Sequence, residues 1–275
     1  MTDSHQERRL LDAACEIARE AGRAILEVYG RDDFAVSRKS DDSPLTEADE
    51  VAHGIISRAL AKLDPGLPIL SEESLPSDHA QRRQWQRYWL VDPLDGTKEF
   101  LKRNGEFTVN IALVAEHRAV LGAVHAPVLD RMYFGHVALG AWRSDAAGPP
   151  KPIAVRNAGS PLRVVGSRSH PTPELAAYLK RLPPHEITDM GSSLKICLVA
   201  EGAAEIYPRL GPTSEWDTAA AQAILESAGG RMIDLAGQPL RYNSKDALLN
   251  PHFLAFGDQR RDWLAPIQST SDRQD

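Results

Sequence analysis

The chain has 275 residues, of which 25% are charged and 42% hydrophobic, a composition typical of globular proteins and unlike that of disordered or fibrous ones. Its 38 acidic and 32 basic residues give a net charge of −6 with no offsetting basic run, so binding to a nucleic acid polymer or to a membrane surface is a poor hypothesis. Two cysteines, Cys15 and Cys197, are too few for a disulfide framework or a zinc–thiolate site. Since we find neither a secretory signal nor an apolar transmembrane segment, we expect a cytoplasmic protein.

The N-terminal part of the chain predicts two amphipathic helices. Apolar residues recur at intervals of three and four over residues 10–28, which predicts a helix that ends near Gly30. The polar residues 31–44 predict a loop or a short hairpin. A second helix is expected to begin at Thr46 and to stop at Pro65-Gly66.

The pattern then changes to short β runs, which predict a mostly antiparallel sheet between residues 67 and 140. Residues 146–160 are poor in large apolar side chains and rich in proline. They predict a boundary between an N-terminal α+β lobe, residues 1–150, and a smaller C-terminal α/β lobe, residues 151–275. Strands and helices alternate in the second lobe, which favours a layered α/β arrangement.

The segment Asp92-Pro93-Leu94-Asp95-Gly96-Thr97 directly follows an apolar strand. Two carboxylates three residues apart at a strand end can converge, with the Leu94 carbonyl between them. Such a set of oxygen atoms is what hard cations prefer. A turn that merely reverses the chain is the competing interpretation.

Three further acidic clusters also lie at predicted element ends. Glu72 follows a short apolar run, where a solvated loop is the alternative. Asp49 and Asp217 each lie in the first turn of a predicted helix, where capping is the alternative. A carboxylate in a first turn can also point towards a metal, so the two interpretations are compatible.

Taken together, these clusters are consistent with a site for magnesium-assisted phosphoryl transfer. Five carboxylates and a phosphate monoester repel one another, and about two or three Mg²⁺ ions would largely cancel that charge and polarise the phosphoryl oxygens. The carboxylates concerned are Asp49, Glu72, Asp92, Asp95 and Asp217.

Both long motifs, in this order and separation, resemble the inositol monophosphatase superfamily of Mg²⁺-dependent, lithium-sensitive phosphatases. They are Val91–Thr97, with Glu72 upstream of it, and Trp216-Asp217-Thr218-Ala219-Ala220. The intervening sequences DGTKEFLKRNGEFTVNIAL, GSSLKICLVAEG and YPRLGPTSEWDTAA are similar to the bacterial CysQ type, 3′(2′),5′-bisphosphate nucleotidase. Inositol monophosphatases usually carry an asparagine where this chain has Glu99. The resemblance implies a layered αβαβα sandwich of the inositol monophosphatase / fructose-1,6-bisphosphatase type.

The resemblance also implies roles for the acidic residues. Glu72, Asp92 and the Leu94 carbonyl would hold a first Mg²⁺, and Asp92, Asp95 and Asp217 a second. A third, weaker ion would lie by Glu72 and Asp49, largely through waters.

The same resemblance implies the residues around the phosphate. Asp49 and Thr97 would orient and deprotonate the attacking water, and Gly96 and Thr97 would offer backbone N–H groups to the phosphate. Residues in two further segments, Ser169, His170, Ser193 and Lys195, would contact the nucleotide and its second phosphate. A helix cap, a turn or a surface loop is the alternative for these last residues.

The implied reaction is removal of the 3′-phosphate of adenosine 3′,5′-bisphosphate (PAP), and also of PAPS, in sulfur assimilation. The alternatives are a broad inositol-1-phosphate phosphatase and a non-enzymatic metal- or nucleotide-sensing module. Related folds are often homodimers, and a peripheral contact with the cytoplasmic side of the inner membrane is sometimes attributed to the CysQ type.

Overall fold

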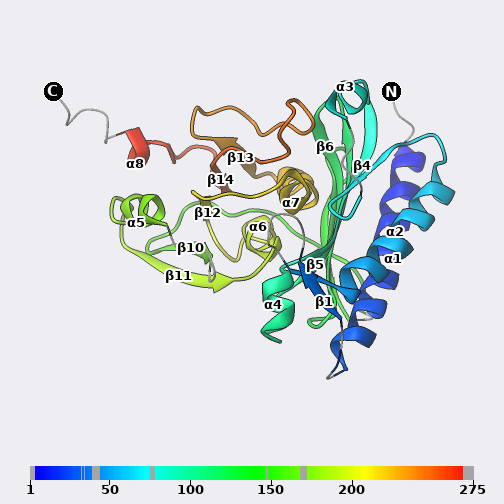
Figure 1. Ribbon diagram of the computed structural model, residues 1–275. Helices are drawn as coiled ribbons and strands as arrows, with labels where there is room; N and C mark the ends of the chain where they lie inside the picture. Colours follow the sequence, from blue (N-terminus) through cyan, green and yellow to red (C-terminus); the bar gives the residue numbers. More distant parts are fainter. Residues whose placement is uncertain are drawn as a thin grey trace.

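The computed structural model describes residues 4–31, 33, 35–38, 44–74, 78–146, 148–167 and 172–268. These residues form five layers in the order helices, sheet, helices, sheet, helices (Figure 1). The arrangement is the predicted αβαβα sandwich. No helix in the described part of the chain is long and apolar enough to cross a lipid bilayer.

The first sheet has seven strands in the order in which the chain forms them, from β3 to β9. β3 and β4 are parallel, and all later neighbours are antiparallel, as the short β runs predict. The strands are β3 (Ile69–Ser71), β4 (Arg87–Asp95), β5 (Thr108–Ala115), β6 (Arg118–Ala126), β7 (Arg131–His136), β8 (Gly140–Asp145) and β9 (Lys151–Pro152).

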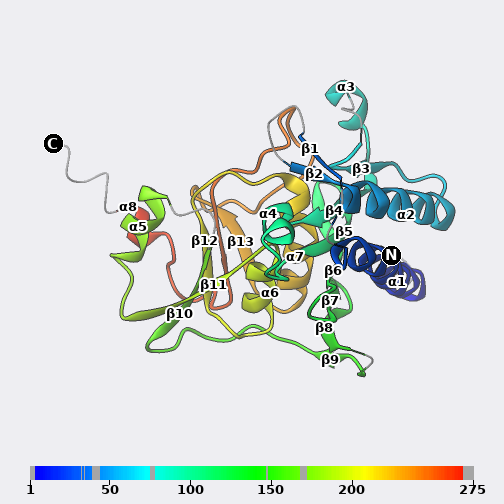
Figure 2. The ribbon, with the colours of Figure 1, turned by 60° about the horizontal axis from the view of Figure 1, so that its bottom comes forward.

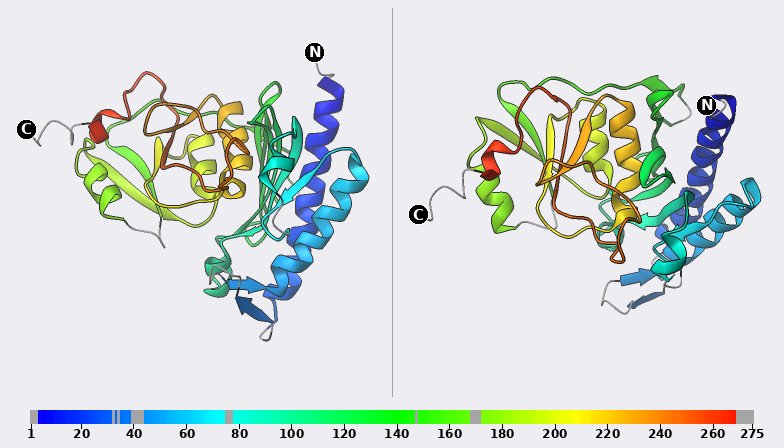
Figure 3. Two further views of the ribbon diagram at one scale, coloured as in Figure 1. Left: turned by 45° about the horizontal axis from the view of Figure 1, so that its top comes forward. Right: turned by 90° about the horizontal axis from the view of Figure 1, so that it is seen from above.

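The two long N-terminal helices cover the outer face of this sheet (Figure 2). They are α1 (Ser4–Tyr29) and α2 (Glu47–Leu63), close to the predicted bounds. Leu11, Ile25 and Ile56 of their apolar stripes are fully buried. The polar segment between them contains the hairpin of β1 (Val36–Arg38) and β2 (Pro44–Thr46), which lies near α4 (Thr97–Leu101) (Figure 3, left).

The second sheet has five strands in the order β11-β10-β12-β14-β13. Helices α6 (Leu194–Ala200) and α7 (Glu215–Ser227) lie between the two sheets, and α5 (Pro173–Leu179) and α8 (Ala265–Gln268) lie on the far side of the second. The strands are β10 (Leu162–Ser167), β11 (His185–Met190), β12 (Ile206–Arg209), β13 (Arg231–Asp234) and β14 (Phe253–Phe256). A short helix, α3 (His79–Arg82), precedes β4.

Helix α7 lies directly against the first sheet because small residues meet there. A Cβ added to Gly122 of β6 would come 2.0 Å from the Ala220 carbonyl oxygen, so any larger residue would push the helix away. The α7 residues Ala219, Ala221 and Ala223 are fully buried. One hydrophobic core therefore joins the first sheet to the C-terminal part of the chain, and the boundary near residue 150 stays a prediction.

Candidate metal centre and substrate cavity

A β-bulge at the end of β4 brings two carboxylates to the same side of the strand. In a regular strand, side chains three residues apart point to opposite faces. Here Asp92 pairs with Asn110 and Asp95 with Thr108, so β4 contains one residue more than β5 over the same interval. The Leu94 N–H donates to Asp92 Oδ1 at 3.0 Å. The Asp-Pro-Leu-Asp segment is thus a bulge within the strand and does not reverse the chain.

Helix α7 adds a third carboxylate to this pair. Oxygen atoms of Asp92, Asp95 and Asp217 lie within 4.8 Å of one another. Asp217 also caps its helix, because its Oδ2 accepts the Ser214 N–H at 2.9 Å in a reciprocal capping box. The two interpretations of this residue therefore hold at once: one oxygen caps the helix while the carboxylate faces the acidic cluster.

Glu72 lies beside Asp92 because β3 and β4 run parallel. Ser71 pairs with Val91, and the Glu72 N–H donates to the Val91 carbonyl at 3.1 Å. The next residue on each strand is therefore the predicted ligand. Burial, followed by the charge of Glu72, raises the pKa of Asp92.

The remaining carboxyls of the cluster also resist ionisation. Burial and the charge of Asp95 raise the pKa of Asp217 to about 8. Burial raises the pKa of Asp95 to about 6, although Lys195 and the Ser193 N–H oppose the shift. Crowded carboxylates of this kind gain most from a hard divalent cation, which needs oxygen ligands and offsets their repulsion. The donor set fits such an ion.

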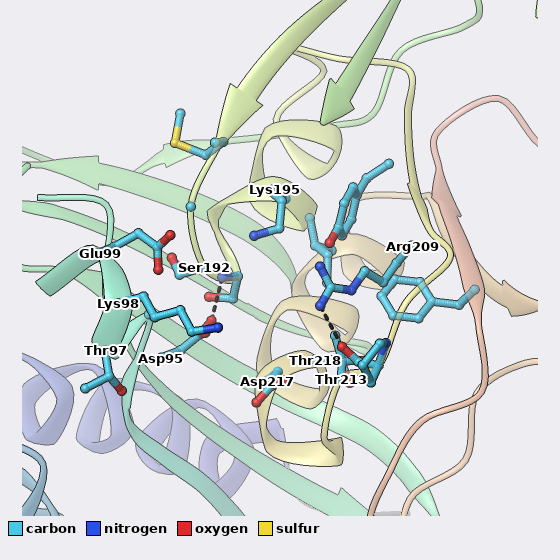
Figure 4. A pocket seen from close by; sticks show the side chains of 18 residues that line it. Asp95, Thr97, Lys98, Glu99, Ser192, Lys195, Arg209, Thr213, Asp217 and Thr218 are labelled. Atoms are coloured by element: carbon cyan, nitrogen blue, oxygen red, sulfur yellow. Dashed lines mark hydrogen bonds between the residues drawn. The ribbon is translucent and has the colours of Figure 1, made fainter. Parts of the chain in front are cut away.

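Asp49 and Thr97, the predicted water-activating pair, lie at the starts of two helices. Asp49 is buried in the first turn of α2, where its Oδ2 accepts the Thr46 N–H at 2.8 Å and the Thr46 hydroxyl at 2.6 Å. Thr97 begins α4, next to β2, and is one of the residues that line the cavity described below (Figure 4). The catalytic role of the pair stays a prediction.

A cavity of about 230 Å³ opens beside the acidic cluster. Cationic side chains of Lys98, Lys195 and Arg209 contribute to its walls, as Figure 4 shows. The predicted site residues that line it are Asp95, Gly96, Thr97, Ser193, Lys195 and Asp217. Four others, Asp49, Glu72, Asp92 and Leu94, do not line it, and Ser169 and His170 lie outside the described residues.

Two adjacent serines at the start of α6 have different surroundings. The Ser193 N–H donates to Asp95 Oδ2 at 2.6 Å, and its hydroxyl donates to the Asn110 side-chain oxygen at 2.8 Å. The buried Ser192 hydroxyl lines the cavity and has no hydrogen-bond partner among the described residues. Ser192 is not among the predicted contacts, because the motif Gly-Ser-Ser-Leu-Lys does not indicate which of its two hydroxyls faces a ligand.

Arg209 is a second residue of the cavity that is not among the predicted contacts. Its side chain is only 7% exposed, lines the cavity and donates to the Pro212 carbonyl at 2.6 Å. A charged residue within an otherwise apolar strand, here Ile206–Arg209, was the available signal. Its neighbour Tyr207 lies against Lys195, with Nζ 5.7 Å from the ring centroid, and burial lowers the pKa of Lys195 to about 8.

The layered fold and the acidic cluster agree with what the motifs imply about the family of this chain. The chain belongs to the inositol monophosphatase family, whose sequence model matches residues 6–269.

Individual relatives are similar over almost the whole chain. The 3′(2′),5′-bisphosphate nucleotidase CysQ of Salmonella typhimurium is 53% identical over 245 residues, which are 89% of this chain and 98% of that protein. CysQ of Escherichia coli K12 is 52% identical over the same shares. The crystal structure of CysQ from Bacteroides thetaiotaomicron, a bacterial member of the inositol monophosphatase family, is 42% identical and superposes with a TM-score of 0.81, covering 92% of this chain and 98% of that one. The fold predicted from the motifs is confirmed.

Proposed function

We propose that the protein is a Mg²⁺-dependent 3′(2′),5′-bisphosphate nucleotidase that hydrolyses PAP to AMP and phosphate, with PAPS as a further substrate. The observation that carries this proposal is a cavity lined by groups of both charges. Asp95 and Asp217 of the acidic cluster line it, and Lys195 and Arg209 line it as well. The relatives at 52–53% identity carry the name of this activity.

The acidic cluster, together with bound metal, would bind the phosphate that reacts. Glu72, Asp92 and the Leu94 carbonyl would hold one Mg²⁺, while Asp92, Asp95 and Asp217 would hold another; a third ion would lie near Glu72 and Asp49. Bound Mg²⁺ polarises phosphoryl oxygens and offsets the charge of phosphate and carboxylates.

Asp49 and Thr97 would orient the attacking water and take one of its protons as the new P–O bond forms. The bond from phosphorus to the ribose 3′-oxygen breaks, and this oxygen takes up a proton from solvent water to leave as the 3′-hydroxyl of AMP. Gly96, in the left-handed region with φ 94°, turns the chain so that its own N–H and that of Thr97 can meet the phosphate.

Lys195 and Arg209 are the residues that would recognise the second phosphate of the substrate. Lys195 and Arg209 are both at least nine-tenths buried, so each charge gains little from water and much from a phosphate. Ser192 adds a hydroxyl with no hydrogen-bond partner in the described part of the chain, and Ser193, Ser169 and His170 stay predicted contacts. A substrate with a single phosphate, such as inositol 1-phosphate, would leave these cationic side chains without a phosphate to bind.

The test is phosphate release from PAP and from inositol 1-phosphate at saturating Mg²⁺. Two charge-assisted hydrogen bonds to the second phosphate contribute about 1.5–3 kcal/mol each, so kcat/KM for PAP should exceed that for inositol 1-phosphate by at least about a hundredfold. Equal or better turnover of inositol 1-phosphate would replace this function with the broad phosphatase. PAP binding without turnover would point to a sensing module.

Several finer expectations stay predictions. They are a role in sulfur assimilation, a cytoplasmic location, a peripheral contact with the inner membrane and a homodimer. The described residues add no support for the membrane contact.

A further inference from the structure

The metal-facing carboxylate of Asp217 depends on the position of the residue that it caps. Its Oδ2 accepts the Ser214 N–H at 2.9 Å, and the Asp217 N–H donates to the Ser214 carbonyl at 3.2 Å. A shift of Ser214 would therefore rotate or move the carboxylate relative to Asp92 and Asp95.

The loop that contains Asn250 holds this turn through backbone and side-chain contacts. The Glu215 N–H donates to the Leu248 carbonyl at 2.8 Å, and the Asn250 amide is the side chain of this loop that contacts the turn on both sides of Asp217. Asn250 Nδ2 donates to the Ser214 carbonyl at 2.7 Å, to Thr218 Oγ1 at 3.0 Å and to Thr213 Oγ1 at 3.2 Å. Since a carbonyl oxygen can only accept, the contact with Ser214 sets the orientation of the amide. The Asn250 N–H also donates to the Thr213 carbonyl at 2.8 Å.

The Asn250 amide contacts residues on both sides of Asp217 in the sequence. Ser214 precedes it by one helical turn and Thr218 follows it directly, and Thr213, Asp217 and Thr218 lie together at the cavity in Figure 4. Asn250 does not itself line the cavity. It is therefore placed to act on the acidic cluster only through its neighbours.

We infer that Asn250 is a positioning residue that sets the metal affinity of the Asp92–Asp95–Asp217 cluster by fixing the first turn of α7. The inference rests on the proposed metal-binding role of Asp217. Residues that orient a metal ligand typically contribute about 10–100-fold to metal affinity. Loss of the Asn250 amide should weaken Mg²⁺ binding by a factor in that range.

Gln259 offers a matched control at the other end of the same helix. Its Nε2 donates to the Gly229 carbonyl at 2.8 Å, just beyond the end of α7. Asn250→Ala and Gln259→Ala thus each remove an amide that holds a backbone carbonyl near one end of α7. Only the first lies next to the acidic cluster.

The experiment measures Mg²⁺ binding by calorimetry without substrate, together with the Tm of the metal-free proteins. We expect Asn250→Ala to raise the Mg²⁺ Kd at least about tenfold and Gln259→Ala to leave it near the wild-type value. Asn250→Asp preserves the shape of the side chain but has no amide donor. Its extra negative charge alone would strengthen cation binding, whereas loss of positioning weakens it, so we expect a raised Kd here too.

Unchanged Mg²⁺ affinity in Asn250→Ala, tighter binding in Asn250→Asp, or an equal loss in Gln259→Ala would each overturn the role of Asn250. If Asn250→Ala does not fold, Asn250→Asp decides by the same criterion. A wild-type protein that binds no Mg²⁺ would instead refute the metal mechanism of the proposed function, so the two failures are distinguishable.

Discussion

Replacement of Asp217 by asparagine separates the two roles that the structure combines in one side chain. The side-chain oxygen of asparagine accepts a hydrogen bond as a carboxylate oxygen does, so the contact with the Ser214 N–H should survive in Asp217→Asn. The charge that faces Asp92 and Asp95 is lost. Fold and metal chemistry should therefore respond in opposite directions.

The expected gain in stability follows from the raised pKa. An acid whose folded pKa lies near 8 instead of 3.8 destabilises the metal-free fold progressively as the pH rises from about 4 to about 8. The full shift corresponds to an upper bound on the order of 6 kcal/mol. Because Asp217 is partly exposed and its neighbours share the repulsion, we expect about half of this at pH 8, or a rise in Tm of about 6 °C without metal.

The expected loss of activity follows from the missing ligand charge. Metal stabilisation of a phosphoryl transition state amounts to several kcal/mol, so losing about 3–5 kcal/mol of it would lower kcat/KM by about 10²–10⁴-fold. The assay is phosphate release from PAP over a Mg²⁺ titration, with thermal unfolding at pH 5 and pH 8 on the same preparation.

Asp262→Asn is the capping control. Asp262 accepts the Leu264 and Ala265 N–H groups at 2.9 and 3.1 Å at the start of α8, away from the acidic cluster. This variant should leave turnover unchanged. An active, less stable Asp217→Asn enzyme would refute the reasoning and return Asp217 to a purely structural role.

Three other outcomes test the remaining parts of the site. Excess chelator should abolish activity and Li⁺ should inhibit it, because Li⁺ is similar in size to Mg²⁺ but carries half the charge; full turnover in chelator would contradict the metal mechanism. Thr97→Ala should lower kcat by about 10²–10⁴-fold while the Mg²⁺ Kd stays unchanged, and wild-type kcat would exclude Thr97 from water activation. Lys195→Ala should impair PAP hydrolysis by about ten- to a hundredfold and spare inositol 1-phosphate, so an equal loss on both substrates would exclude a role in reading the second phosphate.

Local sequence patterns determined most of the secondary structure. The apolar stripes of α1 and α2 follow the helical period. Helix α1 ends at Tyr29, next to the predicted stop at Gly30, and α2 begins after the N-cap Thr46 and ends before Pro65-Gly66. Asp92 and Asp95 were identified as convergent because the Asp-Pro-Leu-Asp segment ends an apolar strand. The bulge that achieves this convergence depends on pairing with Asn110 and Thr108, which the segment does not encode by itself.

Tertiary structure decided which residues share the site. Ser214 and Asp217 can form a capping box wherever the helix lies in the fold. Asp217 joins Asp92 and Asp95 because α7 packs closely against the first sheet at Gly122. The same holds for Ser192, Arg209 and Asn250, whose local sequence is compatible with a turn, a strand and a loop. Their significance arises from contacts between segments far apart in the chain, and no periodicity within one segment records such contacts.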